Sequence, residues 1–391
     1  MIKTEFIKLA LKDFFLHKGN IHNNKKHIVI SLDWLSRAQD NGVDGGVSAW
    51  YGVFSGWSEP YIETTGYIIS TFLESHHLFK NKDYLSRATK MADFLLSVQL
   101  KNGGFKTYLN AENEDSTPTI FNTGQDLIGM VDMYKESGVK KYLDSIIKAS
   151  DFLCKSIDDL GRWAMYSYDG KGHSYDSRVA YALVKAYQVT KVKKYKDVAM
   201  RNLNWVLKQQ NPNGWFKNAK LPPPNPELPY THTISYTIEG LLFSGILLKD
   251  NRLISSAKKA SDALLDYYNE KGFMAGTFNS KWASSDKYSC LTGNAQISFV
   301  WGVLYLHTKD KKYLDASDRM NQYLKSKNNV DSRDLNIRGS IAGSFPIYGD
   351  LIKRQGYCRM ALINWASKFF IDALLMNELI KTQSSIKYIG K

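Results

Sequence analysis

The sequence predicts an all-α fold, an (α/α)6 toroid in which six helical hairpins close into a ring, and three observations lead to this prediction. One block recurs about every 53 to 60 residues. Each copy contains an apolar helix, a short turn rich in Lys and Asp, and a second, amphipathic helix. No long alternation of apolar and polar residues, the pattern typical of β-strands, interrupts these blocks.

The two helices of each block differ in how their apolar residues are distributed. The first helices begin near residues 63, 122, 175, 232 and 292. They are apolar nearly all round, as is typical of a helix packed on both sides. The second helix has a 3.6-residue apolar period, for example at Leu203, Val206 and Leu207, so one face meets water. We therefore expect an inner ring of first helices and an outer ring of second helices.

The two ends of the chain supply the remaining hairpin. Residues 359–379 are apolar like the other first helices, and residues 28–46 end in a Gly-Gly pair like the other second helices. We expect these two segments to pair, so that the N- and C-terminal helices close the ring. Residues 1–391 then form one toroid domain, with residues 1–20 as an accessory N-terminal helix.

The cysteines and the N-terminal segment indicate the cellular compartment in which the protein is expected. Cys154, Cys290 and Cys358 are far apart, with no CxxC and no Cys/His pair at metal-ligand spacing, so we expect no disulfide, metal or cofactor. The N-terminal segment is amphipathic and charged, without the continuous apolar core of a signal peptide, and no transmembrane stretch follows. We expect a cytoplasmic protein, whose first helix allows a loose membrane association.

The protein is strongly basic. It has 52 Lys and Arg against 38 Asp and Glu, a net charge of +14. That charge permits nucleic acid, anionic lipid or an acidic glycan as a partner. The lysines are spread in pairs over the outer helices, and no nucleic-acid-binding module is recognisable, so nucleic acid is not expected.

Ring geometry places the candidate site at one end of the toroid. The inner helices begin there, and their N-termini favour anionic groups. The long inserts at residues 105–121, 216–231, 273–291 and 328–357 fall at the same end. Loops this long in a compact domain are usually functional. The repeats also carry six dissimilar polar clusters at this end, which indicates an asymmetric ligand.

Aromatic rings mixed with carboxylates suit a sugar, because rings stack on its C–H faces while carboxylates take its hydroxyls and protons. The candidate catalytic residues are His232, Tyr236, Glu63 and Asp176. The candidate substrate-binding residues are Trp50, Tyr51, Trp57, Gln125, Asp126, His173, Tyr175, Arg178, Trp282, Asn294, Gln296, Tyr348 and Asn364. Structural roles stay open: Glu63 suits a helix N-terminus equally well, and Trp50 and Trp57 can pack beneath their loop.

These residues allow two chemistries. Epimerases and lyases that abstract the C5 proton of a uronic acid need a neutral base, here His232 or Tyr236. They also need a cation or an amide on the carboxylate, here Arg178 or Gln296. A glycoside hydrolase needs two carboxylates flanking the bond. Its candidates are Glu63, Asp126 and Asp176. The Asp-rich motif that a terpene cyclase requires is missing.

Five stretches carry a resemblance to a known superfamily over almost the whole chain. They are GGVSAWYGVFSGWSEPYIETTGYII, DSRVAYALVKAY, YTHTISYTIEGLL, LTGNAQISF and NWASKFFIDALL. They resemble the six-hairpin toroids of carbohydrate-active proteins, including squalene-cyclase-like and pectate-lyase-like proteins of polysaccharide gene clusters. HTISYTIEGLL is more loosely similar to the helical domains of glucuronyl C5-epimerases and polysaccharide lyases. The resemblance implies a sugar-processing ring.

We therefore expect an enzyme acting on an acidic, uronic-acid-containing polysaccharide or oligosaccharide by C5 proton abstraction, as an epimerase or lyase. One alternative is a glycoside hydrolase with paired carboxylates, such as an unsaturated-uronyl hydrolase. The other is a non-catalytic glycan-binding ring in a polysaccharide biosynthesis complex. The expected partners are the acidic glycan and other enzymes of polysaccharide biosynthesis.

Overall fold

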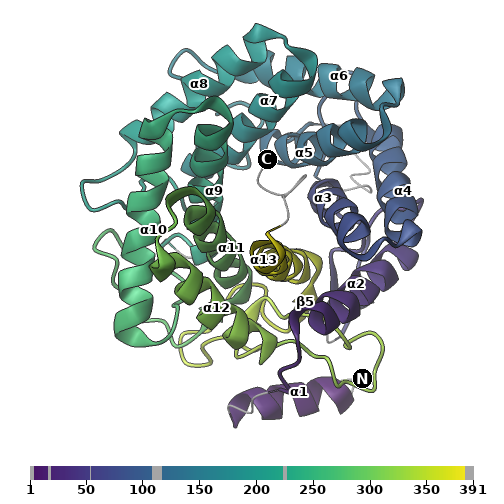
Figure 1. Cartoon of the computed structure of the whole chain (residues 1–391), viewed down its shortest axis with the longest axis vertical. Coiled ribbons are helices and arrows are strands. Elements are labelled where there is room, and N and C mark those ends of the chain that lie inside the picture. Colours follow the sequence, from purple (N-terminus) through teal and green to yellow (C-terminus); the bar gives the residue numbers. More distant parts are fainter. Residues whose placement is uncertain (1–3, 16–18, 53, 108–116, 223–226, 384–391) are drawn as a thin grey trace.

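The computed structural model describes residues 4–15, 19–52, 54–107, 117–222 and 227–383, and their helices form the predicted ring (Figure 1). The inner helices are α3 (Ile62–Phe79), α5 (Ile120–Ser137), α7 (Ser177–Thr190), α9 (Thr231–Leu248), α11 (Leu291–Thr308) and α13 (Asn364–Thr382). The outer helices are α2 (Asn24–Asp40), α4 (Lys82–Val98), α6 (Lys140–Ser156), α8 (Lys193–Lys208), α10 (Asn251–Lys271) and α12 (Lys311–Lys325). A 3₁₀ turn, η1 (Ser174–Asp176), precedes α7. The (α/α)6 prediction is confirmed.

The turn rich in Lys and Asp reverses the chain between the two helices of a hairpin. Inner helices end at a residue with left-handed backbone, which closes a helix because it turns the chain away from the axis. These residues are Lys80, Gly138, Lys191, Lys249, Lys309 and Gln383. Asn81, Asp250 and Asp310 then cap the following outer helix by accepting a backbone N–H two residues ahead.

The Thr-Gly pair near the start of several inner helices allows close helix packing. A Cβ on Gly66 of α3 would lie 2.5 Å from the Cα of Asp126 on α5. A Cβ on Gly293 of α11 would lie 2.6 Å from the backbone nitrogen of His232 on α9. Any side chain there would push neighbouring inner helices apart, so these glycines keep the inner ring narrow.

The chain ends close the ring as predicted. Helix α13 packs against α2 and α3. The Asn24 side chain of α2 donates to Asn377 Oδ1 of α13 at 3.0 Å. Strand β1 (Trp50–Gly52) pairs antiparallel with β2 (Gly56–Trp57) and, across the closure, with β5 (Ala361–Ile363). A second two-stranded sheet joins β3 (Ser289–Cys290) to β4 (Ser344–Phe345).

Helix α1 (Thr4–Phe14) lies outside the ring, at the lower edge of the view in Figure 1. Phe6 stacks on Tyr51 with ring centroids 5.9 Å apart. The Asp13 carboxylate accepts the backbone N–H of Ile347 at 2.7 Å, which fixes the other end of the helix. Within the described ranges, no helix is both long and apolar enough to cross a membrane.

Candidate active site

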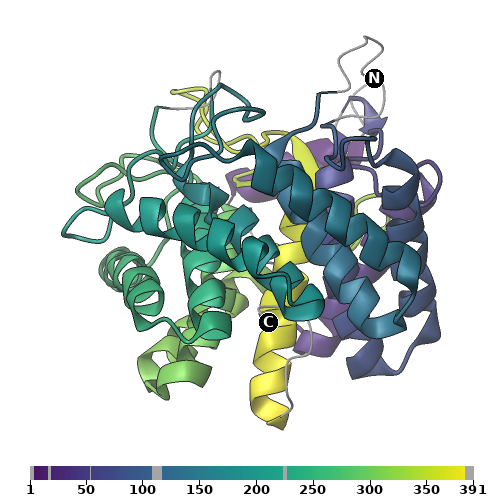
Figure 2. The same ribbon diagram turned by 90° about the horizontal axis from the view of Figure 1, so that it is seen from above.

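A cavity of about 540 Å³ opens at the end of the ring where the inner helices begin, and the long loops gather at this end (Figure 2). Its size is within the usual range of small-ligand sites. Most of its walls are aromatic. Among the described residues it is lined by Trp50, Tyr61, Glu63, Thr64, Tyr67, Phe121, Tyr168, Tyr175, Leu221, Pro222, His232, Thr233, Tyr236, Tyr357, Cys358 and Trp365.

Glu63, in the first turn of α3, is the single carboxyl group in this lining. Its Oε2 accepts the hydroxyls of Tyr61 at 2.9 Å and Tyr168 at 3.5 Å. Burial raises the pKa of Glu63 to about 7, although both tyrosine hydroxyls oppose the rise. The side chain is therefore divided between acid and carboxylate at neutral pH, as a general acid requires.

His232, in the first turn of α9, is held by an amide behind it. Its Nδ1 lies 2.6 Å from Oε1 of Gln296 on α11. An amide oxygen only accepts, so Nδ1 carries the proton and Nε2 keeps its lone pair. Burial lowers the pKa of His232 to about 3, which keeps the ring neutral.

Gln296 joins His232 to the buried charges below it. Burial raises the pKa of Glu239 on α9, and the Arg178 guanidinium and the Gln296 amide partly offset this rise. Gln296 presents its amide oxygen to the imidazole. The tautomer of His232 is thus set by a residue outside the cavity lining.

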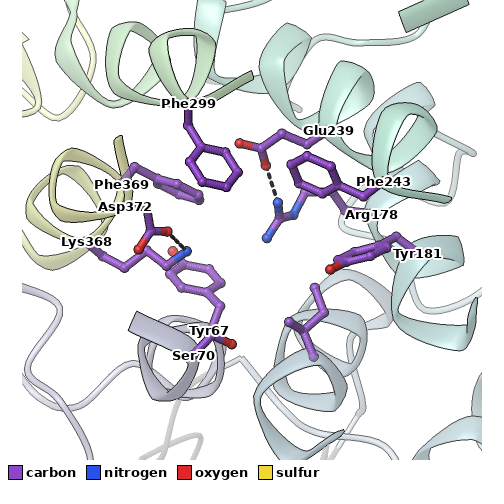
Figure 3. Close-up of a pocket in the computed structure, with 11 residues that line it drawn as sticks. Tyr67, Ser70, Arg178, Tyr181, Glu239, Phe243, Phe299, Lys368, Phe369 and Asp372 are labelled. Carbon is purple, nitrogen blue, oxygen red and sulfur yellow. Dashed lines mark hydrogen bonds and ion pairs between the residues drawn. The ribbon is translucent and has the colours of Figure 1, made fainter. Parts of the chain in front are cut away.

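The floor of the cavity is a layer of paired charges and rings around a space of about 20 Å³, room for roughly one water molecule (Figure 3). Arg178 on α7 forms an ion pair with Glu239, and its Nε donates to Gln125 Oε1 at 3.0 Å. The guanidinium also lies over the Tyr236 ring, 4.9 Å from its centroid. Lys368 pairs with Asp372, one turn along α13. The cavity is therefore blind at its inner end.

Several predicted site residues line the cavity together. Glu63, His232 and Tyr236 do so among the candidate catalytic residues. The His232 and Tyr236 rings, one turn apart on α9, have centroids 4.3 Å apart. Trp50 and Tyr175 line it among the candidate binding residues. These five side chains come from β1, α3, η1 and α9, so the predicted convergence at one end of the ring is what the structure shows.

The predicted carboxylate Asp176 lies outside the cavity lining. It accepts the backbone N–H of His173 at 3.0 Å, so it caps the 3₁₀ turn that precedes α7. Asp126 is also behind the wall, fully buried beside Gly66, and neither of its oxygens has a hydrogen-bond partner among the described residues. Burial raises the pKa of both acids, that of Asp176 to about 8. The expected pair of carboxylates in the cavity is not formed.

Three predicted aromatic ligands have structural contacts instead, and a fourth lines a different hollow. Tyr51 and Trp57 pack together with Trp34, and Trp57 Nε1 donates to Asn336 Oδ1 at 3.0 Å. Trp282 donates to the Asn213 carbonyl at the outer rim. The fourth, Tyr348, lines a separate hollow beside α1.

The remaining predicted polar ligands are also placed outside the lining. His173 stacks on Tyr175 and contacts Asp169 at 2.9 Å. Asn364 ties the ring closure by donating to the Ser48 carbonyl and to Thr64 Oγ1. Gln125, Arg178 and Gln296 lie beneath the cavity, and Asn294 is fully buried within α11.

The sequence interpretation missed several lining residues and the ion pairs below them. Tyr67 follows Glu63 by four residues, the spacing that put His232 and Tyr236 on one helix face, so the same rule would have found it. Glu239 lies seven residues after His232 on that face. Tyr168 and Tyr357 come from loops, where no periodicity marks them. Among the described residues, no three His, Cys, Asp or Glu side chains converge as a metal site would require.

The ring fold is shared with solved structures of sugar-processing enzymes. The unsaturated glucuronyl hydrolase of Bacillus sp. GL1 superposes with a TM-score of 0.73 at 12% identity, covering 94% of this chain and 100% of that one. Cellobiose 2-epimerase of Bacillus thermoamylovorans superposes with a TM-score of 0.66 at 13% identity, covering 95% of this chain and 99% of that one. A D-mannose isomerase superposes with a TM-score of 0.68 at 15% identity, covering 92% of this chain and 97% of that one. These likenesses establish the shared fold across hydrolases, epimerases and isomerases.

The sequence itself identifies the family. Residues 16–259, more than half of the chain, match the family model described as the β-L-arabinofuranosidase, GH127 catalytic domain. The chain belongs to this family. No curated protein matches the sequence. The expectation of a carbohydrate-active toroid enzyme is confirmed at this level.

Proposed function

We propose that the protein is a glycoside hydrolase that removes a terminal neutral sugar, with Glu63 as general acid and His232 as general base. The observation that carries the proposal is the state of Glu63, a carboxyl in the cavity wall whose pKa burial raises to about 7. Such a group keeps its proton near neutral pH and gives it to the leaving oxygen as the glycosidic bond breaks.

His232 supplies the second group that hydrolysis needs. It stands on α9, and α3 with Glu63 is the opposite helix of the inner ring, with two inner helices between them in either direction (Figure 1). A sugar between them meets the acid on one face and the base on the other. His232 Nε2 takes a proton from the attacking water, the role that a second carboxylate fills in inverting glycoside hydrolases.

The charge of the cavity favours a neutral sugar over the acidic glycan that we expected. Among the described lining residues there is no Lys or Arg. The cation beneath, Arg178, is occupied by Glu239 and Gln125. A uronate carboxylate would therefore lose its hydration without gaining a cationic partner, which is costly in a buried site. The family description, which refers to arabinofuranosides, agrees with a neutral sugar.

The blind floor favours cleavage at a chain end. Buried rings and ion pairs close the ring axis beneath Tyr67 and Tyr236, so a polymer has no exit at that end. One terminal sugar fills the cavity, and the rest of the substrate extends through the mouth.

Epimerisation is the second candidate. His232 is neutral, and its ring lies 4.3 Å from that of Tyr236, an arrangement that suits removal and return of a carbon-bound proton. Glu63 would then polarise the neighbouring oxygen. This candidate preserves the proton-abstraction chemistry expected from the sequence.

The test compares products from matched substrates in deuterated water. The protein is incubated with p-nitrophenyl β-L-arabinofuranoside, other neutral p-nitrophenyl glycosides, and the corresponding glucuronide. We expect nitrophenol from a neutral glycoside, with no deuterium on the sugar carbons. Carbon-bound deuterium without nitrophenol would support epimerisation instead. Cleavage of the glucuronide alone would overturn the neutral-sugar assignment.

A further inference from the structure

Two further hollows extend the cavity across the surface toward α1. The first, of about 520 Å³, shares Trp50, Cys358 and Trp365 with the cavity. The second, of about 300 Å³, shares Phe54 and Met360 with the first. Because each hollow shares wall residues with the next, the three hollows adjoin one another. We call the two outer hollows together the apolar furrow.

The lining of the furrow next to α1 consists of apolar side chains and one tyrosine. Phe54 is 72% exposed and Phe14 is 63% exposed, although both are large aromatic residues. Leu11 also points to solvent from α1. Contiguous exposed apolar surface is uncommon in a folded monomer and marks a binding site.

Helix α1 forms a fixed wall of the furrow. Phe6 stacks on Tyr51, and Asp13 accepts the Ile347 N–H, so both ends of the helix are attached to the ring. Lys8 and Lys12 are exposed on the same helix. A helix with an apolar face flanked by lysines is typical of an interface between water and lipid.

We propose that the apolar furrow is the aglycone subsite, and that the substrate is a glycoside of a long apolar alcohol, a glycolipid in chemical class. This inference rests on the proposed function, and it is carried by the walls that the furrow shares with the cavity. A sugar between Glu63 and His232 directs its glycosidic oxygen toward the mouth, where Trp50 and Trp365 begin the furrow.

The reaction is hydrolysis with no other reactant. The bond between the anomeric carbon and the alcohol oxygen breaks, and the oxygen of a water molecule bonds to that carbon. Glu63 gives its proton to the alcohol oxygen, and His232 takes one from the water. The products are the free sugar and the apolar alcohol.

Binding tests the subsite without turnover. S-methyl, S-butyl and S-octyl thioglycosides of β-L-arabinofuranose resist hydrolysis, and calorimetry measures their affinities for the full chain. We expect affinity to rise about two- to four-fold per methylene along the furrow, with an increasingly negative heat-capacity change. Equal affinities for the three compounds would overturn the inference. Chain-length dependence without hydrolysis of any O-glycoside would contradict the proposed function alone.

Turnover separates the two sources of such a substrate. O-octyl β-L-arabinofuranoside is supplied below its micelle concentration, or within vesicles of phosphatidylcholine and phosphatidylglycerol. A higher kcat/KM on vesicles supports a membrane glycolipid, and a higher value on the dispersed compound supports a soluble amphiphile. Values equal to that for the O-methyl glycoside in both forms would overturn the subsite.

Variants locate the effect in the furrow. In Phe54→Ser we expect the ratio of octyl to methyl thioglycoside affinity to fall about ten-fold, because the octyl chain loses an aromatic wall. Leu160→Ser is the matched control, since Leu160 is 65% exposed and lines none of the three hollows. Circular dichroism checks that each variant folds. A folded Phe54→Ser protein with the wild-type ratio would contradict the proposal.

Discussion

The cavity and the layer beneath it are built on the same inner helices, but they differ in whether a buried ionisable group has an oppositely charged partner. In the cavity, Glu63 and His232 are buried with only neutral hydrogen-bond partners. In the layer below, three buried carboxylates each have a cation beside them. The described pairs are Arg178 with Glu239, Lys185 with Asp132, and Lys368 with Asp372.

The difference shows how one ring separates chemistry from stability. A buried group without a counter-charge shifts its pKa toward the neutral form, which suits proton transfer. A buried pair retains its charges, and it fixes two helices relative to each other as long as both partners are present. Lys185 and Asp132, for example, join α7 to α5 at 2.5 Å. Four predictions test this division.

The largest effect is expected in the cavity. Glu63→Gln removes the proposed acid without changing its volume, and we expect kcat on the active aryl glycoside to fall ~10²–10⁴-fold. The unfolding free energy at pH 7 should not decrease, because no ion pair is broken. Glu59→Gln makes the same change at an exposed position. If kcat of Glu59→Gln fell by the same factor, the result would contradict a catalytic role for Glu63.

Below the cavity we expect a loss of stability. Asp132→Leu removes the carboxylate of a buried ion pair and leaves the Lys185 charge in the interior, so the free energy of unfolding in denaturant should fall by about 3–5 kcal/mol. Adding Lys185→Met should restore most of it. Asp93→Ala is the control for the exposed pair of Lys141 and Asp93, expected to cost about 0–1 kcal/mol. Equal losses in the buried and exposed pairs would contradict the division.

The third prediction concerns stability against pH. Glu63 has a pKa of about 7 in the folded chain against 4.5 ordinarily, so the folded state binds more protons between these values. Its contribution is complete below pH 4.5 and is lost as the pH rises through 7. Relative to Glu63→Gln, the wild-type unfolding free energy should fall by about 3 kcal/mol from pH 4 to pH 8. A constant difference would mean that the carboxyl is hydrated.

The smallest effect is expected at Gln296, which lies between the cavity and the charged layer beneath it. Gln296→Leu removes the acceptor that orients His232, so kcat should fall about five- to ten-fold with KM little changed. Asn294→Leu is the matched control on the same helix, since both polar atoms of Asn294 lack hydrogen-bond partners among the described residues. Similar kinetics in the two variants would show that Gln296 does not position the histidine.

Local patterns determined the ring and part of the cavity. The apolar period separated inner from outer helices, and the inner helices begin at Ile62, Ile120, Ser177, Thr231 and Leu291, within a few residues of the expected starts. The first two turns of α3 and α9 therefore place Glu63, His232 and Tyr236 at the mouth. The spacing of apolar residues along a helix indicates which of its faces is buried, so burial can be predicted from the sequence.

Tertiary structure alone decided which of these polar groups remain available to a ligand. Arg178 meets Glu239, 61 residues away, so the residue expected to bind a carboxylate is occupied. Trp57 reaches Asn336, 279 residues away, and becomes part of the closure. The Asp176 carboxylate accepts the backbone N–H of His173 in its own loop. Periodicity records whether a side chain is buried. Its partner is set by the distance between atoms that the folded ring brings together from distant parts of the chain.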